Sequence, residues 1–390
     1  MGVPTHKAAD RPREAALFLL LFGLPLILGV GLRLATQGAW LNDFDALTCA
    51  AWRAGHGINP YDFGAACPGA RPPPYLYMPQ LAWAMAPLVQ LLAVPELRLA
   101  YGAVHLAVLA FTFAVLFVRP MEGAPAWLRA PLLALTTVGA VGCGNIAYLA
   151  HGLVIGAALL RRRVPWLLVT AIVAVSAVKP VYLGYLLIFA FEPEPLVARV
   201  RRIGAGLGLA LLAAVLVALS GGPALGDWKA ALDQQVVATY TGVAVLNWAA
   251  HLGLRAHDLL TILGYGAFAG AVCLSGLAVC EARGLGREAR LFLALAVAQF
   301  VNPRLMSYDL MMLAPLAIAF ATVPQAGRPA FRIAALAVGL AVLGLHFAGL
   351  SHVAIRAGTL LYALLLLAAG AWAGLDAARV QVRRAGPAPA

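Results

Sequence analysis

Charged residues are scarce in this chain of 390 residues: Asp, Glu, Lys and Arg make up 11% of it, against about a quarter in soluble domains. Hydrophobic residues make up 63%, and the mean hydropathy is +0.87. No soluble fold buries so much apolar surface, so a lipid bilayer must be the solvent. The net charge is +12, but the basic residues form small clusters between apolar runs. That spacing argues against nucleic acid as a partner.

Motifs for metals and nucleotides are also absent from the sequence. It has no HExxH, no CxxC and no His/Cys cluster with the spacing of metal ligands, and no Walker loop or GxGxxG follows a strand pattern. We therefore expect neither a metal nor another cofactor. There are only five cysteines. Cys49 and Cys67 share one loop and could form a disulfide in an oxidising compartment, while the odd total leaves at least one free thiol.

Apolar runs predict an all-α, polytopic membrane protein with about twelve transmembrane helices in one integral-membrane domain, 1–390. Two pairs of runs, 130–160 and 164–191, could instead each form one long helix. The basic residues before the first run resemble a signal peptide, but no cleavage site follows, so we expect an uncleaved span. The runs lie at about 15–35, 97–118, 130–143, 145–160, 164–178, 180–191, 203–220, 259–280, 291–302, 306–323, 332–350 and 354–375.

The distribution of positive charge decides between these topologies. With twelve spans and both termini cytoplasmic, the inside loops hold 19 of the 28 basic residues and the outside loops seven. Fusing either pair of runs would invert every later loop and destroy this bias. Two outside loops are long, 36–96 and 221–258. The tract 81–95 in the first of them is apolar but short, so we interpret it as a re-entrant or interfacial segment.

An amphipathic helix is predicted in the first outside loop, from Asp43 to Gly55, with Asn42 as its N-cap. Asp43 and Asp45 stand at its start, where the helix dipole favours a carboxylate. One of them could act as a general base that deprotonates an acceptor hydroxyl. The alternative is that one caps the helix and the other is solvated.

Further polar residues fall on the same outer face. Tyr75 and Tyr77 lie in a rigid proline-rich stretch and could anchor the loop at the interface or form the wall of a sugar site. Lys179 and Arg304 could hold a phosphate, although Arg304 could instead pair with Asp309. In the turn Gly142-Cys143-Gly144-Asn145, the amide of Asn145 is a candidate for polar contacts, whereas His105 and His151 within the spans are expected to be structural.

At these residues the chain resembles the integral-membrane glycosyltransferases of the GT-C superfamily. It is most similar to the bacterial polyprenol-phosphate-mannose-dependent α-mannosyltransferases, which include the mycobacterial phosphatidylinositol-mannoside enzymes. Within this likeness, Met78-Pro79 stands where members carry Pro-Pro, and Gly144-Asn145 where they carry Gln-x-Asn. The matching pieces are, in order, Asp43-Phe44, Ala54 to Asp62, Pro74 to Pro79, the Gly-Asn turn, Lys179-Pro180 and Asn302 to Asp309.

The resemblance implies a GT-C-like fold and an inverting transfer of a sugar, mannose first, from a polyprenyl-phosphate donor to a lipid or glycan acceptor. It implies that Asp43 is the catalytic base, with Asp45 as the alternative. The reaction would take place on the extracytoplasmic side of a bacterial inner membrane, among membrane lipids. The substrate-binding residues would be Lys179, Arg304, Tyr75, Tyr77, Asn145, Tyr61 and Asp309.

A multi-span transporter or lipid flippase is the alternative function, and an assembly scaffold is a third. Twelve spans with both termini inside suit a transporter as well. The two halves of the chain show no evident similarity, however, and the polar residues gather on one face. Both features favour glycosyl transfer.

Overall fold

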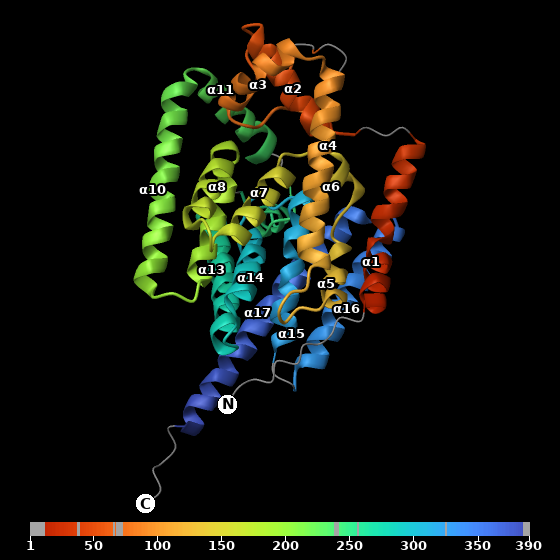
Figure 1. Ribbon diagram of the computed structural model, residues 1–390, viewed down its shortest axis with the longest axis vertical. Coiled ribbons are helices and arrows are strands. Elements are labelled where there is room, and N and C mark those ends of the chain that lie inside the picture. Colours follow the sequence, from red (N-terminus) through yellow and green to blue (C-terminus); the bar gives the residue numbers. More distant parts are fainter. Residues whose placement is uncertain are drawn as a thin grey trace, which may run out of the picture.

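The computed structural model describes residues 12–36, 40–64, 67, 73–237, 242–255, 257–323 and 326–384. This part of the chain is helical throughout and contains no extended strand, as predicted (Figure 1). Six helices are long and apolar enough to cross a membrane. They are α1 (Pro12–Ala35), α4 with its π-helical end η1 (Val94–Val118), α10 (Leu196–Gly221), α13 (Leu259–Ala282), α16 (Arg328–Phe347) and α17 (Ser351–Arg384).

Shorter helices form the centre of the molecule. The most enclosed are α14 and η4, in which nearly every residue is buried. The long helix α10, in contrast, is only 6% buried along its apolar window, as suits a helix that faces lipid. The shorter elements are α5 (Ala126–Leu133), α6 (Val138–Gly142), α7 (Ala147–Leu160), α8 (Pro165–Val178), η2 (Pro180–Leu187), α9 (Ile188–Phe191), α14 (Arg287–Phe300), η4 (Ser307–Leu316) and α15 (Ala317–Thr322).

Each of the twelve predicted runs coincides with helical structure. Since only six of the helices reach spanning length, the number of spans stays a prediction. The alternative in which the pairs of runs 130–160 and 164–191 each form one long helix is wrong. The run 130–160 is broken between α5 and α7, and 164–191 is broken at Lys179, whose φ of −144° leaves helical geometry. Pro180 follows, and a residue before proline disfavours the helical region.

The two long loops that are predicted to be outside pack on each other and form a small cap at the upper end of the molecule (Figure 1). We use "outer cap" for α2 (Asn42–Gly55), α3 (Pro79–Leu91), α11 (Ala224–Leu232) and the segments that join them to their neighbours. The tract predicted to be interfacial is the helix α3. Asn59 donates to Asp227 (2.8 Å) and Trp228 donates to the carbonyl of Leu76 (3.1 Å), so side chains join the two loops. The π-helical η3 (Asp233–Val237) and α12 (Val245–His251) follow α11.

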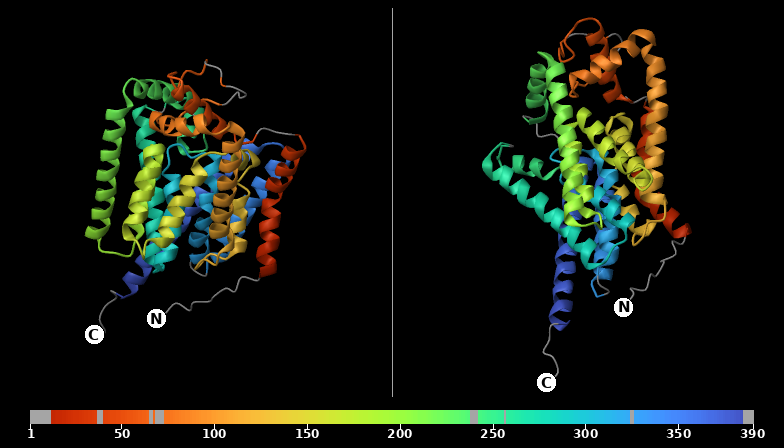
Figure 2. Two further views of the ribbon diagram at one scale, coloured as in Figure 1. Left: turned by 45° about the horizontal axis from the view of Figure 1, so that its top comes forward. Right: turned by 60° about the vertical axis from the view of Figure 1, so that its left-hand side comes forward.

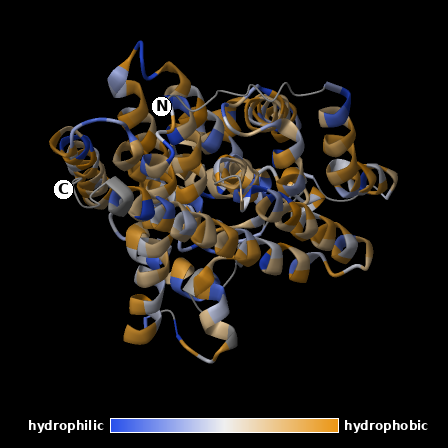
Figure 3. Cartoon of the chain, turned by 90° about the horizontal axis from the view of Figure 1, so that it is seen from below, coloured by the Kyte–Doolittle hydropathy of each residue, from blue (hydrophilic) through white to orange (hydrophobic). Residues whose placement is uncertain are grey.

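Ion pairs gather at the opposite end. Each joins residues that the charge pattern put in inside loops or at the inside ends of spans, so the predicted grouping of these loops agrees with the contacts. Which end faces the cytoplasm stays a prediction. Helix α1 begins and α17 ends at this lower end, and hydrophobic residues predominate along the helices all round (Figures 2 and 3). The pairs are Arg119–Glu288, Arg161–Glu192, Arg199–Glu281, Arg202–Glu194, Arg283–Asp376, Arg287–Glu192 and Arg290–Glu281.

Cysteine labelling tests the orientation. Lys229 in the outer cap and Arg162 at the opposite end are both exposed. In intact cells, a membrane-impermeant maleimide should label Lys229→Cys, and it should label Arg162→Cys only after permeabilisation, because the basic loops stay in the cytoplasm. The reverse pattern would invert the topology.

Candidate functional site

Helix α2 carries both acidic candidates, as the amphipathic pattern predicts. It begins at Asn42 itself, so the predicted cap is wrong by one residue. The N-cap is Leu41, in the left-handed region with φ of 57° and without a side-chain cap. Phe44 and Leu47 are buried in the small core of the outer cap. One face of the helix is thus fixed against α3, and its first turn is directed at the bundle.

The start of α2 is docked on the turn between α6 and α7. The backbone N–H of Leu41 donates to the carbonyl of Gly142 (2.7 Å), and that of Asp43 donates to the carbonyl of Cys143 (2.8 Å). Asn145 donates from Nδ2 to Oδ2 of Asp43 (2.6 Å). Gly144 has φ of 68°, and a Cβ there would lie 3.0 Å from the Leu41 Cα, so only glycine suits this turn. These contacts hold the Asp43 carboxylate at the boundary between cap and bundle.

Asp43 and Asp45 point to different surroundings, because side chains two residues apart on a helix diverge by about 200°. Oδ2 of Asp45 forms an ion pair with Arg98 (3.5 Å) away from the turn. Burial raises the pKa of Asp45, and Arg98 opposes the shift. Asp43 therefore is the carboxylate that belongs to the predicted site, and Asp45 is a partner of Arg98.

Lys179 lies at the break between α8 and η2, and it is only 8% exposed. Its Nζ donates to the hydroxyl of Tyr308 (2.9 Å) and that of Tyr182 (3.4 Å). It also lies over the Tyr308 ring, 4.5 Å from the centroid. The carboxylates of Asp43 and Asp309 both interact electrostatically with this ammonium. A charge at this depth thus has two acidic neighbours on opposite sides of the cap boundary.

Asp309 is completely buried, and its partners differ from the predicted one. Its Oδ1 lies 2.9 Å from Nε2 of His151, and its Oδ2 accepts from the backbone N–H of Met306 (2.9 Å). No ion pair joins it to Arg304 in the described part of the chain, so the alternative in which Arg304 pairs with Asp309 is not formed. The backbone N–H of Arg304 instead donates to Asn302 (2.9 Å), and its buried Nε has no hydrogen-bond partner among the described residues.

Arg304 supplies the second positive charge beside Lys179. Its guanidinium interacts electrostatically with the Lys179 ammonium and with the Tyr308 phenol. Two like charges within electrostatic range repel each other, and an anion bound near both would relieve that repulsion. The structure thus brings together both cations that the sequence put forward for a phosphate.

The three predicted tyrosines have different surroundings. Tyr61 donates to the carbonyl of Tyr77 (2.6 Å), and Tyr75 donates to that of Met78 (2.7 Å), so both hydroxyls brace the proline-rich stretch. Burial raises the pKa of Tyr61, which remains a protonated donor. Tyr77 interacts electrostatically with Asp43 and Tyr308. It is the tyrosine of this stretch that adjoins the charged residues.

Several site residues were missed by sequence reasoning. Tyr308 lies in the segment from Asn302 to Asp309, and Cys143 lies in the turn Gly142-Cys143-Gly144-Asn145. Both segments were singled out in the sequence, but no role was predicted for either residue. Tyr101, which donates to the carbonyl of Gly144 (2.7 Å), gave no signal at all. Tyr182 and Tyr185 had one signal: with Lys179 they recur at intervals of three, the period of a 3₁₀-helix.

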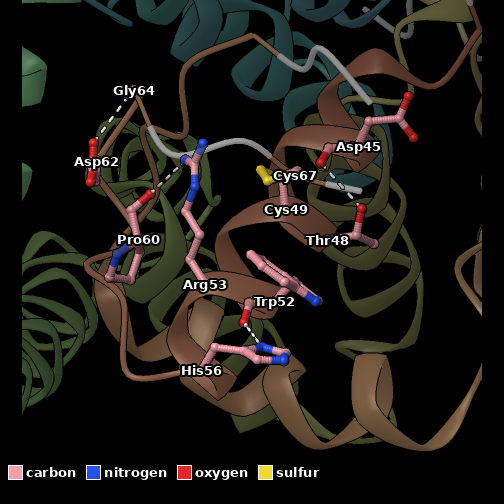
Figure 4. The surroundings of a disulfide bond; sticks show 10 residues. All are labelled: Asp45, Thr48, Cys49, Trp52, Arg53, His56, Pro60, Asp62, Gly64 and Cys67. Atoms are coloured by element: carbon pink, nitrogen blue, oxygen red, sulfur yellow. Dashed lines mark hydrogen bonds between the residues drawn. A yellow bond between two sulfur atoms is a disulfide. The ribbon is translucent and has the colours of Figure 1, made fainter. Parts of the chain in front are cut away.

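A disulfide joins Cys49 of α2 to Cys67 (Figure 4). Their Cα atoms are 5.7 Å apart. In the same region Arg53 donates to the carbonyl of Pro60 (3.4 Å), so α2 is tied to the loop that follows it. Cys143, Cys273 and Cys280 are free thiols. The pairing that the sequence left open is therefore formed.

Comparisons with protein-family models, curated proteins and solved structures find no match to this chain. Among the described residues, no group of three His, Cys, Asp or Glu side chains is placed to hold a metal ion. The candidate site combines one carboxylate, Asp43, with two cations, Lys179 and Arg304, and with the phenol of Tyr308, all of which interact electrostatically. Such an arrangement can accept a proton and hold an anionic group.

The raised pKa of Asp45 predicts how the stability of the folded protein depends on pH. A folded-state pKa above the ordinary 3.8 contributes stability below pH 3.8, and this contribution is lost as the pH rises through the raised pKa. Asp45→Asn cannot ionise, so its melting temperature relative to wild type should rise between low pH and pH 7. A relative melting temperature of Asp45→Asn that falls with pH would show that the ion pair with Arg98 outweighs burial.

Proposed function

We propose that this protein is an integral-membrane glycosyltransferase of the inverting kind. It moves a sugar, with mannose as the first candidate, from a polyprenyl-phosphate donor to a hydroxyl of a lipid or glycan acceptor. We place the reaction on the extracytoplasmic face of a bacterial inner membrane. One observation carries the proposal: Asp43, oriented by Asn145, lies within electrostatic range of Lys179, and so does Arg304, although these residues come from four distant parts of the sequence.

The acceptor hydroxyl attacks the anomeric carbon of the donor sugar. Oδ of Asp43 takes the proton from that hydroxyl as the new C–O bond forms, and the bond between the anomeric carbon and the phosphate oxygen breaks. The electron pair of the broken bond stays on the polyprenyl phosphate. Because the base and the leaving group lie on opposite sides of the sugar, the anomeric configuration inverts.

Lys179 and Arg304 stabilise the departing phosphate. The leaving group gains negative charge as the bond breaks, and fixed cations in a site shielded from water lower the energy of that state. A phosphate leaves without protonation, so the site needs no general acid. Asn145 is a positioning residue, because its amide contacts the Asp43 carboxylate and the backbone of Ala147.

The location of the site suits a lipid-linked donor. Lys179 and Asp309 lie where the short central helices begin, and Asp43 belongs to the cap above them. A polyprenyl chain can remain in lipid while its phosphate reaches the cations at the boundary. Tyr77 and Tyr308 add phenol rings and hydroxyl groups, which suit a sugar.

Asp43→Asn tests the base. The variant keeps an oxygen for the Asn145 amide and preserves the shape of the side chain, but it cannot accept a proton at neutral pH. Turnover with a synthetic polyprenyl-phosphate sugar should fall by at least ~10²-fold, with donor affinity retained. Asp45→Asn is the matched control and should transfer sugar at near wild-type rates. Wild-type turnover in both variants would remove the carboxylate from the mechanism.

Arg304→Ala tests the phosphate site. Removal of the guanidinium should weaken the binding of a polyprenyl phosphate by about 10-fold or more, since a hydrogen bond between charged groups is lost. Arg304→Lys should recover part of the affinity, because the charge returns without the planar fork. The measurement is direct binding in detergent, with folding checked by melting temperature. Unchanged affinity in Arg304→Ala would exclude Arg304 as a phosphate ligand.

A further inference from the structure

A row of buried polar side chains continues from Lys179 into the apolar centre of the bundle. It comprises Asp309, His151, Tyr185 and Gln299, each at most 2% exposed. They come from η4, α7, η2 and α14, which are distant in sequence. Polar groups inside an apolar core cost free energy unless every partner is supplied, so four of them in one line require an explanation.

Hydrogen bonds join the members of this row one after another. Gln299 donates from Nε2 to the hydroxyl of Tyr185 (2.7 Å). The Tyr185 hydroxyl lies 2.6 Å from Nδ1 of His151. Nε2 of His151 lies 2.9 Å from Oδ1 of Asp309, within hydrogen-bond distance of that carboxylate.

His151 thus supports one side of the Asp309 carboxylate. On its other side, Asp309 interacts electrostatically with the ammonium of Lys179.

Tyr182 joins the two charges. Its hydroxyl lies 3.4 Å from Nζ of Lys179, from which it accepts, and 3.5 Å from Oδ1 of Asp309, to which it donates. Oδ2 of Asp309 is occupied by the backbone N–H of Met306. Both oxygens of this completely buried carboxylate thus have partners within the protein, and Tyr182 links it to Lys179.

We propose that His151, Tyr185 and Asp309 are positioning residues: Asp309, oriented by His151, keeps Lys179 charged and directed at the donor phosphate. The proposal rests on the proposed function, because it assigns Lys179 to a phosphate. A buried ammonium without a fixed counter-charge loses its proton or its position. Asp309 supplies this counter-charge. The hydrogen bonds of the row, through His151, hold the Asp309 carboxylate in place.

The experiment measures the affinity of the full-length protein in detergent for farnesyl phosphate. His151→Phe, which removes both ring nitrogens, should lower the affinity about 10-fold, as for the loss of one hydrogen bond to a charged group. His151→Gln places an amide N–H near Asp309 and should restore most of it. Lys179→Met gives the affinity for farnesyl phosphate that is expected when the ammonium is absent. His105→Phe is the matched control, since His105 is also buried but faces the carbonyl of Val141 (3.0 Å), and it should bind as wild type.

Wild-type affinity in His151→Phe, together with weak binding in Lys179→Met, would overturn the positioning role and leave the phosphate site intact. Equal binding by wild type and Lys179→Met would instead overturn the phosphate site and with it the proposed function. If His151→Phe does not fold, Tyr185→Phe decides the question. It removes one hydroxyl without changing the ring, and it should weaken binding about 3- to 10-fold, whereas an unchanged affinity would contradict the role of the row.

Discussion

The docking of Leu41 and Asp43 on the turn between α6 and α7 is the contact on which the site depends. Two backbone hydrogen bonds and one from Asn145 join the outer cap to the bundle there. Without them, Asp43 would be one surface carboxylate among several, and Lys179 would lack its neighbour across the boundary. This contact requires the left-handed backbone conformation of Leu41 and a glycine at position 144. The cap is therefore part of the site and not a cover over it.

The helices were predictable because burial in lipid acts on every residue of a run, so composition alone marks each segment. The grouping of the loops was predictable because positive charge is kept on one side, and the ion pairs agree with it. The partner of Asp309 was not predictable. It depends on the distance between η4 and α7, and nothing in either segment records that His151 lies 2.9 Å away. The roles of Asp43 and Asp45 could not be separated either, since they depend on the rotation of α2 about its axis.

Two kinds of electrostatic environment divide the molecule. At the lower end, arginines pair with carboxylates in several loops, and many of these groups are partly exposed, so each pair contributes little by itself. In the candidate site the charges are fewer and more deeply enclosed: Lys179 is 8% exposed and Asp309 is completely buried. Partly exposed pairs like those at the lower end suit the ends of a helical bundle, whereas enclosed charges are suited to chemistry.

The 3₁₀ winding of η2 limits how this region can evolve. With three residues per turn, side chains three apart are superimposed along the helix, which is why the rings of Tyr182 and Tyr185 stack 6.0 Å apart. One inserted or deleted residue between them would turn Tyr185 by about 120° and remove its hydroxyl from His151. Substitutions at the other positions of η2 would not change this rotation, so the Tyr185 hydroxyl would stay beside His151. Related chains that share the site should therefore vary here in residue type and never in length.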